Sequence, residues 1–391
     1  MPDTKEHMVY FGGWYQRTTL HLTEIANFFA YGKSDLPLSK EKLHKLRVSL
    51  ELKEVSREAG YLEYVRAVTA DGIRIHYYED GLYILKISSS NIDESKKKLE
   101  EYYNEKFSPA IAYIFSLGAP TPKELANIKT VHPIAVGVIN KSPDKYVVEP
   151  KYGEIYSNIT SPELTVKKTA GFLFLIAKPE YEMMMEGLVE MQIFFREFKD
   201  QLQKYLDIHR KLWEEISDIK ERKQIKGTEV EKVRLQLDAY QKTINLISSR
   251  INQMSAYVHT RTDIAKEMKL EEYLSNVFQY KFEVLSNTHS YIKEIWSMTN
   301  NYLSAAIAVV TEIKGQATNK SIQSLQLITT YGVVGGIIGY LSRESLPKVT
   351  SQGMIYFGLL MAITFLVNLL VRTGYAGIKY KVKFVDRVKN I

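Results

Sequence analysis

The chain has 391 residues, which is enough for two or three folded units, and 25% of them are charged. It contains no cysteine, which excludes disulfides, thiolate metal sites and cysteine nucleophiles. The net charge is +7 at pH 7, and the residues after 371 hold six basic side chains against one acidic one. Because the excess lies in this short tail, the charge does not indicate a nucleic-acid interface.

Residues 1–178 predict a mixed α/β domain. Asp71-Gly72 and Asp80-Gly81 separate short β-rich runs and are typical of hairpin turns. The amphipathic segment Asn91–Tyr103 predicts a helix. The expected strands are Val9–Tyr15, Leu46–Val55, Tyr61–Thr69, Ile73–Tyr78, Leu82–Ile87, Pro133–Ile139, Tyr146–Glu149, Ile155–Ile159 and Thr165–Ile176.

Residues 179–321 predict a helical stalk. After Pro179 a single proline remains, and apolar residues recur every three or four positions. The pattern predicts two antiparallel helices, Glu182–Lys223 and Thr228–Lys269, followed by a third that begins near Leu270 and continues to Leu341. The strict spacing between Val230 and Val258 indicates a coiled-coil seam.

Two uncharged apolar stretches follow, Ile322–Leu341 and Met354–Val371. Their length matches a hydrocarbon core of about 30 Å, so residues 322–371 predict a two-span transmembrane hairpin with the lipid bilayer as a partner. The basic tail, residues 372–391, predicts a cell-membrane protein with both termini in the cytoplasm. The predicted fold class is α+β: an N-terminal mixed α/β cytosolic domain, a stalk of long antiparallel helices and a C-terminal two-helix transmembrane hairpin.

The order of these elements resembles the CorA family of divalent-cation channels. Thr318-Asn319, followed by Ile322, Leu325, Ile328 and Thr330, is similar to the pattern with which that family approaches its first span. The resemblance implies a homo-oligomer, a homopentamer as in the family, that transports Mg²⁺ or another divalent cation. In the loop between the stretches, Arg343, Glu344 and Ser345 stand where the family carries Gly-Met-Asn, which leaves the transported ion open.

One face of the first apolar stretch is the candidate site. In the CorA-like interpretation this face lines a pore, with Ile322 and Leu325 as a hydrophobic gate. In the alternative interpretation these residues only support helix packing, and the hydroxyl groups bond to backbone carbonyls. The predicted pore-lining residues are Asn319, Ile322, Leu325, Gln326, Thr329, Val333, Gly336 and Tyr340.

Two further groups of residues bear on assembly and on metal binding. The small residues Gly332, Gly335, Gly336 and Gly339 recur at helical spacing and predict close helix packing in an oligomer. Acidic residues of the helical region could bind regulatory cations between subunits or could simply be solvated, so no metal ligand is assigned. These residues are Glu267, Glu271, Glu272, Glu283, Glu294 and Glu312.

The sequence contains no P-loop, no GxSxG and no HExxH, and it predicts no enzyme. The leading hypothesis is a CorA-like oligomeric membrane protein that conducts divalent cations. The alternative is a non-transporting, membrane-anchored coiled-coil scaffold or sensor.

Overall fold

The computed structural model describes residues 7–15, 21–116, 133–221, 224–341, 351–376 and 379–381. The chain forms two compact units. The first comprises Met1–Ile208 and Leu246–Ile295, and the second comprises His209–Asn245 and Trp296–Ile391. Both units therefore draw on the long helices, whereas the predicted boundaries place all of these helices in a separate stalk.

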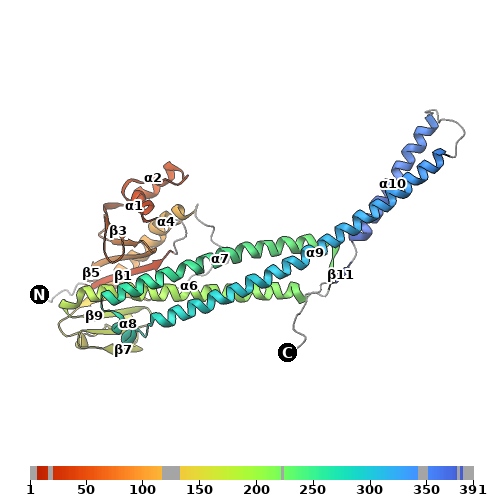
Figure 1. The fold of residues 1–391 in the computed structure, drawn as a ribbon. Coiled ribbons are helices and arrows are strands. Elements are labelled where there is room, and N and C mark those ends of the chain that lie inside the picture. The colour runs from red at the N-terminus through yellow and green to blue at the C-terminus, as the bar shows by residue number, and fades with distance from the viewer. Residues whose placement is uncertain are drawn as a thin grey trace, which may run out of the picture. The chain divides into compact units, whose positions relative to one another are not determined.

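A sheet of nine strands forms the centre of the first unit, in the order β2-β3-β4-β5-β1-β6-β9-β8-β7 (Figure 1). Neighbouring strands run antiparallel except for β6 and β9, which are parallel. The strands are β1 (His7–Trp14), β2 (Leu52–Glu58), β3 (Tyr64–Thr69), β4 (Arg74–Tyr78), β5 (Leu82–Ser89), β6 (Ile134–Ile139), β7 (Ser157–Thr160), β8 (Leu164–Lys168) and β9 (Phe172–Ala177).

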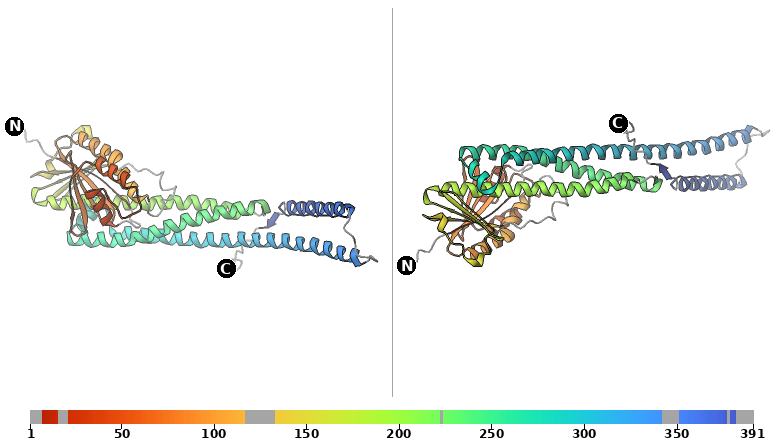
Figure 2. Two further views of the ribbon diagram at one scale, coloured as in Figure 1. Left: turned by 90° about the horizontal axis from the view of Figure 1, so that it is seen from above. Right: turned by 90° about the horizontal axis from the view of Figure 1, so that it is seen from below.

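Short helices cover one face of this sheet: α1 (Leu22–Tyr31), α2 (Lys40–Ser49), α3 (Ile92–Tyr102) and α4 (Ser108–Phe115) (Figure 2). The side chains of Ser39 and Asn91 accept hydrogen bonds from the first turns of α2 and α3, which caps these helices. Their apolar faces bury Phe28, Leu99 and Ile111 against the strands and form one hydrophobic core.

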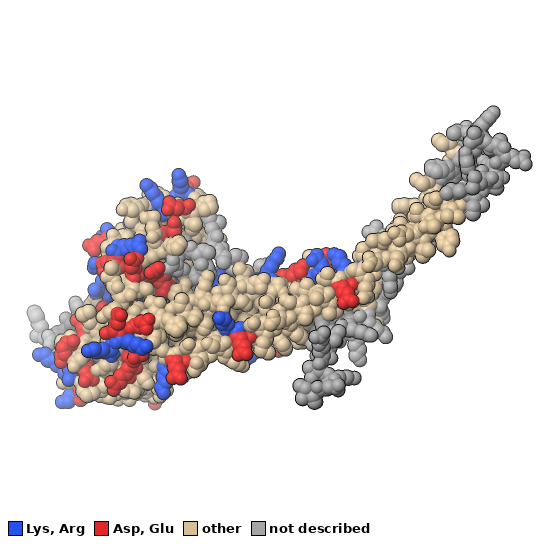
Figure 3. Space-filling view, viewed as in Figure 1, with Lys and Arg blue, Asp and Glu red and all other residues tan. Residues whose placement is uncertain are grey.

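The opposite face of the sheet packs against the first part of α6 (Glu182–Glu221). Glycines permit this contact: a Cβ atom on Gly12 would lie 2.9 Å from Ile193 Cδ1, and one on Gly137 would lie 2.8 Å from Met185 Cε. The last part of α7 (Gly227–Glu267), the short α8 (Glu271–Phe278) and the start of α9 (Phe282–Leu341) complete the unit. Basic and acidic side chains are mixed over the face of this unit that Figure 3 shows.

A buried ion pair joins α7 to the turn between β4 and β5. Arg261 Nε lies 2.6 Å from Asp80 Oδ2, and Arg261 Nη2 lies 3.0 Å from Asp80 Oδ1; the two side chains are 1% and 3% exposed. The same aspartate stabilises its turn, because Leu82 N donates to Asp80 Oδ1 and Trp14 Nε1 donates to the Asp80 carbonyl. The turn itself needs Gly81, whose φ is +88°.

In the second unit the helices meet along apolar seams. Leu212 and Ile216 of α6, Val233 and Leu237 of α7, and Leu303 of α9 are all buried. His209 Nε2 is 2.7 Å from Thr299 Oγ1, and the ring of Trp213 stacks on Tyr302 with centroids 4.8 Å apart. The unit also contains α10 (Ser351–Ala376) and a small ladder of β10 (Gln224–Lys226) with β11 (Lys379–Lys381).

Most of the predicted strands and helices are confirmed, and the errors have local causes. Residues 46–49, predicted as the start of a strand, belong to α2, because the Ser39 cap begins a helix that buries Leu43. The expected strand Tyr146–Glu149 instead connects two 3₁₀ turns that begin with prolines. The third long helix is interrupted at Gln279, which adopts a left-handed conformation with a φ of +59° and ends α8.

The predicted transmembrane hairpin is contradicted. Among the described residues no helix has a stretch long and apolar enough to cross a membrane. A span needs about 20 consecutive apolar residues. In the first predicted span, polar Gln323, Ser324, Gln326, Thr329 and Thr330 interrupt the apolar residues. The predictions of a two-span membrane protein, a cell-membrane location and a membrane channel are therefore wrong on this finding.

The contribution of the Arg261–Asp80 ion pair to stability can be tested by substitution. Replacing Arg261 by Met leaves the Asp80 carboxylate buried without its cation, and we expect the free energy of unfolding to fall by about 3–5 kcal/mol in urea denaturation. The matched control is Lys97→Ala, which breaks a pair whose partners are 76% and 58% exposed and should change stability by less than about 0.5 kcal/mol. Equal effects of the two substitutions would contradict a structural role for the buried pair.

Candidate functional site

The predicted pore-lining residues lie in α9. Asn319 and Gln326 are exposed, as are Ile322 (48%), Leu325 (42%) and Val333 (55%). Thr329 Oγ1 donates to the Leu325 carbonyl at 2.8 Å, as the packing interpretation expects. Tyr340 also belongs to α9, but its side chain lies outside the described part of the structure. The pore role of this face stays a prediction.

The remaining sequence-based sites also stay untested. A Cβ atom on Gly332, Gly335 or Gly336 would meet no atom within 4 Å, so the space on that side of these glycines is open in the described chain. Gly339 lies in α9 without a described environment, and Arg343, Glu344 and Ser345 lie outside the described residues. No group of three or more His, Asp or Glu side chains within the described ranges is placed to hold a metal ion.

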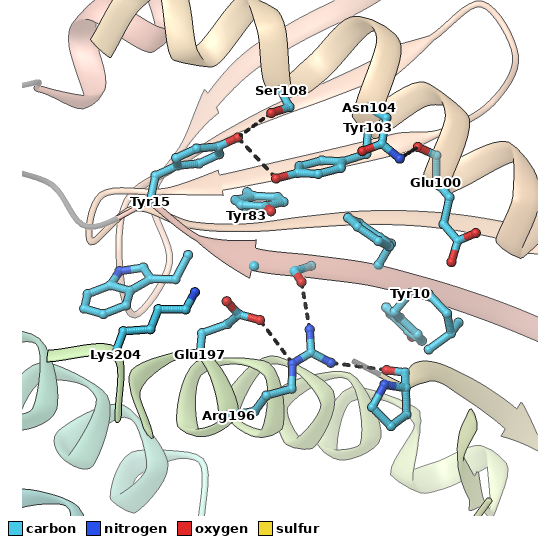
Figure 4. A pocket seen from close by; sticks show the side chains of 16 residues that line it. Tyr10, Tyr15, Tyr83, Glu100, Tyr103, Asn104, Ser108, Arg196, Glu197 and Lys204 are labelled. Carbon is cyan, nitrogen blue, oxygen red and sulfur yellow. Dashed lines mark hydrogen bonds and ion pairs between the residues drawn. The ribbon is translucent and has the colours of Figure 1, made fainter. Parts of the chain in front are cut away.

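The structure instead reveals a cavity of about 550 Å³ in the first unit, where β1 separates from β6 (Figure 4). The pairing of these strands ends at Tyr10 and Ala135, whereas β1 continues beside β5 to Trp14. The cavity is lined from β1, β5, α3, α4, the start of β6 and α6. It therefore forms because two neighbouring strands stop pairing before either of them ends.

Arg196 of α6 bridges this gap between the strands. Its Nη2 donates to the Gly12 carbonyl at 2.8 Å and its Nη1 donates to the Pro133 carbonyl at 3.2 Å. Its Nε lies 3.2 Å from Glu197 Oε1, and the side chains of Arg196 and Glu197 are 11% and 20% exposed. A guanidinium thus satisfies two carbonyl groups that strand pairing has left open, with its charge balanced by a carboxylate.

Three tyrosines and a serine form the opposite wall, as Figure 4 shows. Tyr15 Oη donates to Ser108 Oγ at 3.3 Å and lies 3.4 Å from Tyr103 Oη. The ring of Tyr83 stacks on that of Tyr103, with centroids 5.6 Å apart and an interplanar angle of 7°. Burial raises the pKa values of Tyr15 and Tyr83 well above the ordinary value, so both hydroxyls stay protonated at neutral pH.

The chemistry of the cavity follows from the polar and aromatic groups that line it. The cavity's described lining contains one serine, Ser108, which accepts a hydrogen bond from Tyr15, and the Tyr15 hydroxyl stays protonated at neutral pH and therefore cannot act as the base for this serine. Nucleophilic catalysis requires a base beside the nucleophile. The lining therefore offers aromatic surface, hydroxyl groups and the charged side chains of Lys204, Glu100, Arg196 and Glu197 to a bound molecule.

A second, smaller cavity of about 230 Å³ lies beside the ion pair of Arg261. Tyr78 Oη donates to Glu190, and Glu190 Oε2 lies 4.0 Å from Arg261 Nη1. Burial raises the pKa of Glu190, although Arg261 and the bond from Tyr78 oppose this shift. Burial also lowers the pKa of His76 to about 3, with Lys86 adding to the effect. This cavity belongs to the structural network around Arg261.

Sequence reasoning missed the larger cavity, although one signal was present. Adjacent glycines inside a strand, here Gly12 and Gly13, often mark a close approach of other atoms. A Cβ atom on Gly13 would clash with the Tyr83 hydroxyl. Arg196 and Lys204, in contrast, resemble any other basic residue of a long helix. Only the contact of α6 with the sheet distinguishes them.

The close packing around Gly12 in the cavity predicts that an added methyl group will lower the stability of the protein. In Gly12→Ala the new Cβ would lie 2.8 Å from the Tyr83 carbonyl oxygen and 2.9 Å from Ile193, so β1 and α6 must separate. We expect a loss of about 1–3 kcal/mol in unfolding free energy, measured by urea denaturation. Gly171→Ala is the control, because a Cβ there meets nothing within 4 Å. A stable Gly12→Ala protein would show that this contact is loose.

The low pKa of His76 predicts acid sensitivity. In the unfolded chain the imidazole binds a proton near pH 6.5, whereas in the folded protein it does so only near pH 3. Stability that is complete above pH 6.5 should therefore be lost as the pH falls toward 3, by up to about 1.4 kcal/mol per pH unit. Unfolding of His76→Gln should depend less on pH in this range. Identical profiles for the two proteins would contradict the assignment.

Comparison with known proteins adds no relative. No protein-family model matches the chain, and no curated protein sequence matches it.

Proposed function

We propose that this protein is a non-catalytic scaffold that associates with further copies of itself through the C-terminal half of α9 and through α10. The proposal keeps the scaffold alternative of the sequence analysis without its membrane anchor. The observation that carries it is the exposure of large apolar side chains along both helices, from 37% at Val367 to 76% at Tyr331. Single soluble chains rarely leave apolar patches of this extent uncovered.

The apolar pattern of α9 continues beyond the point where α6 and α7 cover it. Up to Ile313 the seam residues are buried, including Leu303, Ala306 and Val310. Helix α6 ends at Glu221 and α7 begins at Gly227, and no described side chain of α9 after Ile313 is buried. Beyond that point the helix lacks a cover in the described chain, and burial of its apolar surface would yield about 25 cal/mol per Å².

Charge and shape favour an identical partner. Residues 321–341 and 351–371 contain no Asp, Glu, Lys or Arg, so association would desolvate no charge. The open space at Gly332, Gly335 and Gly336 lets another backbone approach closely. A second copy supplies a surface of the same length and composition, and self-complementary contacts are the usual basis of homo-oligomers. The homopentamer and cation transport stay predictions from the resemblance and are not part of this proposal.

The oligomeric mass tests the proposal. Sedimentation of the full chain should give a defined oligomer above the 45.1 kDa of one chain. A double variant, Leu325→Glu with Val333→Glu, should dissociate at higher concentration or become monomeric, because each carboxylate would be desolvated on association. Val48→Glu is the matched control, since Val48 is 59% exposed on α2 of the sheet unit. A monomeric wild type, or a double variant with unchanged mass, would refute self-association through this surface.

A further inference from the structure

We propose that the cavity between β1 and α6 binds a small organic monocarboxylate with a flat apolar body. The inference concerns the sheet unit alone and is independent of self-association. The cavity has a volume of about 550 Å³, which lies in the range of small-molecule sites. Three features of the cavity point to this ligand: the hydrogen-bond donors that α6 leaves open, the aromatic walls and the position of Glu100.

Two cations of α6 that line the cavity, Arg196 and Lys204, present hydrogen-bond donors. Arg196 has five N–H groups, and the contacts with Glu197, Pro133 and Gly12 engage three of them, one on each nitrogen. The two remaining N–H groups belong to different nitrogens of a planar fork, the geometry that suits a carboxylate. Arg196 is held rigidly by its other contacts, so a ligand would not need to order it.

Lys204 contributes the second cation. It lies two turns beyond Arg196 on the same helix, is half-buried, and has no ion-pair partner among the described residues. A half-buried ammonium group that no described carboxylate approaches within 4 Å can accept a further anionic partner. Glu197 lies between the two cations in the sequence, but it pairs with Arg196. A carboxylate ligand would therefore supply the counter-charge that Lys204 lacks.

The walls around these cations are aromatic. Trp14 lines the cavity and stacks on Phe198, with centroids 5.6 Å apart, while Phe11 packs on Tyr103 at 4.8 Å. These rings are held in place by their neighbours and form rigid apolar surfaces. A flat hydrocarbon body fits such surfaces, because stacking on aromatic rings adds to the energy of burial.

Glu100 limits the ligand to one negative charge. It comes from α3, and Figure 4 places its carboxylate on the opposite side of the cavity from Lys204. Glu100 forms no ion pair with a described residue. A second carboxylate on the far end of the ligand would meet this negative charge without compensation. The cavity should therefore select monocarboxylates against dicarboxylates.

Titration calorimetry with three probes on the full chain tests the proposal: phenylacetate, phenethylamine, which has a similar body and a positive charge, and 1,4-phenylenediacetate, which carries a second carboxylate at the opposite end of the ring. We expect saturable binding of phenylacetate and at least about tenfold weaker binding of the other two, the effect of one lost charge-assisted contact or one added repulsion. The intrinsic tryptophan fluorescence, to which Trp14, Trp213 and Trp296 contribute, should change in the wild-type protein and not in Trp14→Phe, because the ligand would lie against the Trp14 ring.

Matched variants locate the site. Lys204→Gln should weaken phenylacetate binding about tenfold, whereas Lys199→Gln, at an exposed position of α6 that does not line the cavity, should leave it unchanged. Glu100→Gln should strengthen 1,4-phenylenediacetate binding and leave phenylacetate binding nearly unchanged. Absence of saturable phenylacetate binding, equal affinity for phenethylamine, or full affinity in Lys204→Gln would each overturn the proposal, whatever the oligomeric mass of the protein.

Discussion

The first unit depends on the buried ion pair between Arg261 and Asp80. A charge enclosed by protein must find an opposite charge and hydrogen bonds, or the folded state loses several kcal/mol. Asp80 meets this requirement with Arg261 and with the amide of Leu82, and the guanidinium also lies over the ring of Tyr78 at 4.9 Å. These contacts couple a turn near residue 80 to a helix near residue 261. The position of α7 against the sheet is therefore set by electrostatic necessity as well as by apolar packing.

A second arginine has a comparable role at the gap between β1 and β6. Arg196 bonds to carbonyl groups of both strands after their pairing has ended, so a side chain of α6 replaces part of the sheet's hydrogen-bond ladder. The separation of the strands creates the cavity, and the arginine that compensates for it keeps two N–H groups available. One side chain, Arg196, thus both supports the separated strands and offers donors to a ligand. The cavity therefore lies where α6 meets the gap between β1 and β6.

The second unit shows how one periodic pattern can serve two environments. Val310 and Ile313 are buried within the chain, whereas Ile322 and Leu325 continue the same apolar character on a helix that has no described cover. The uncharged stretches led the sequence analysis to a transmembrane hairpin, which the described helices contradict. An uncharged apolar stretch indicates only that its side chains are more stable away from water. Whether a partner helix or a lipid covers them depends on their surroundings, and we propose further copies of this chain.

The sequence by itself determined the local structure: the hairpin turns at Gly72 and Gly81, the helix between Asn91 and Tyr103 and the apolar seams of α6, α7 and α9. These features depend on backbone conformation and on spacing, which neighbouring residues control. The tertiary structure alone decided the order of the nine strands, the pairing of Arg261 with Asp80 and the cavity at Arg196. The last two of these join residues more than 60 positions apart, and no local pattern marks which basic side chain of a helix will meet which carboxylate or carbonyl. The candidate site therefore became visible only when α6 was seen against the sheet.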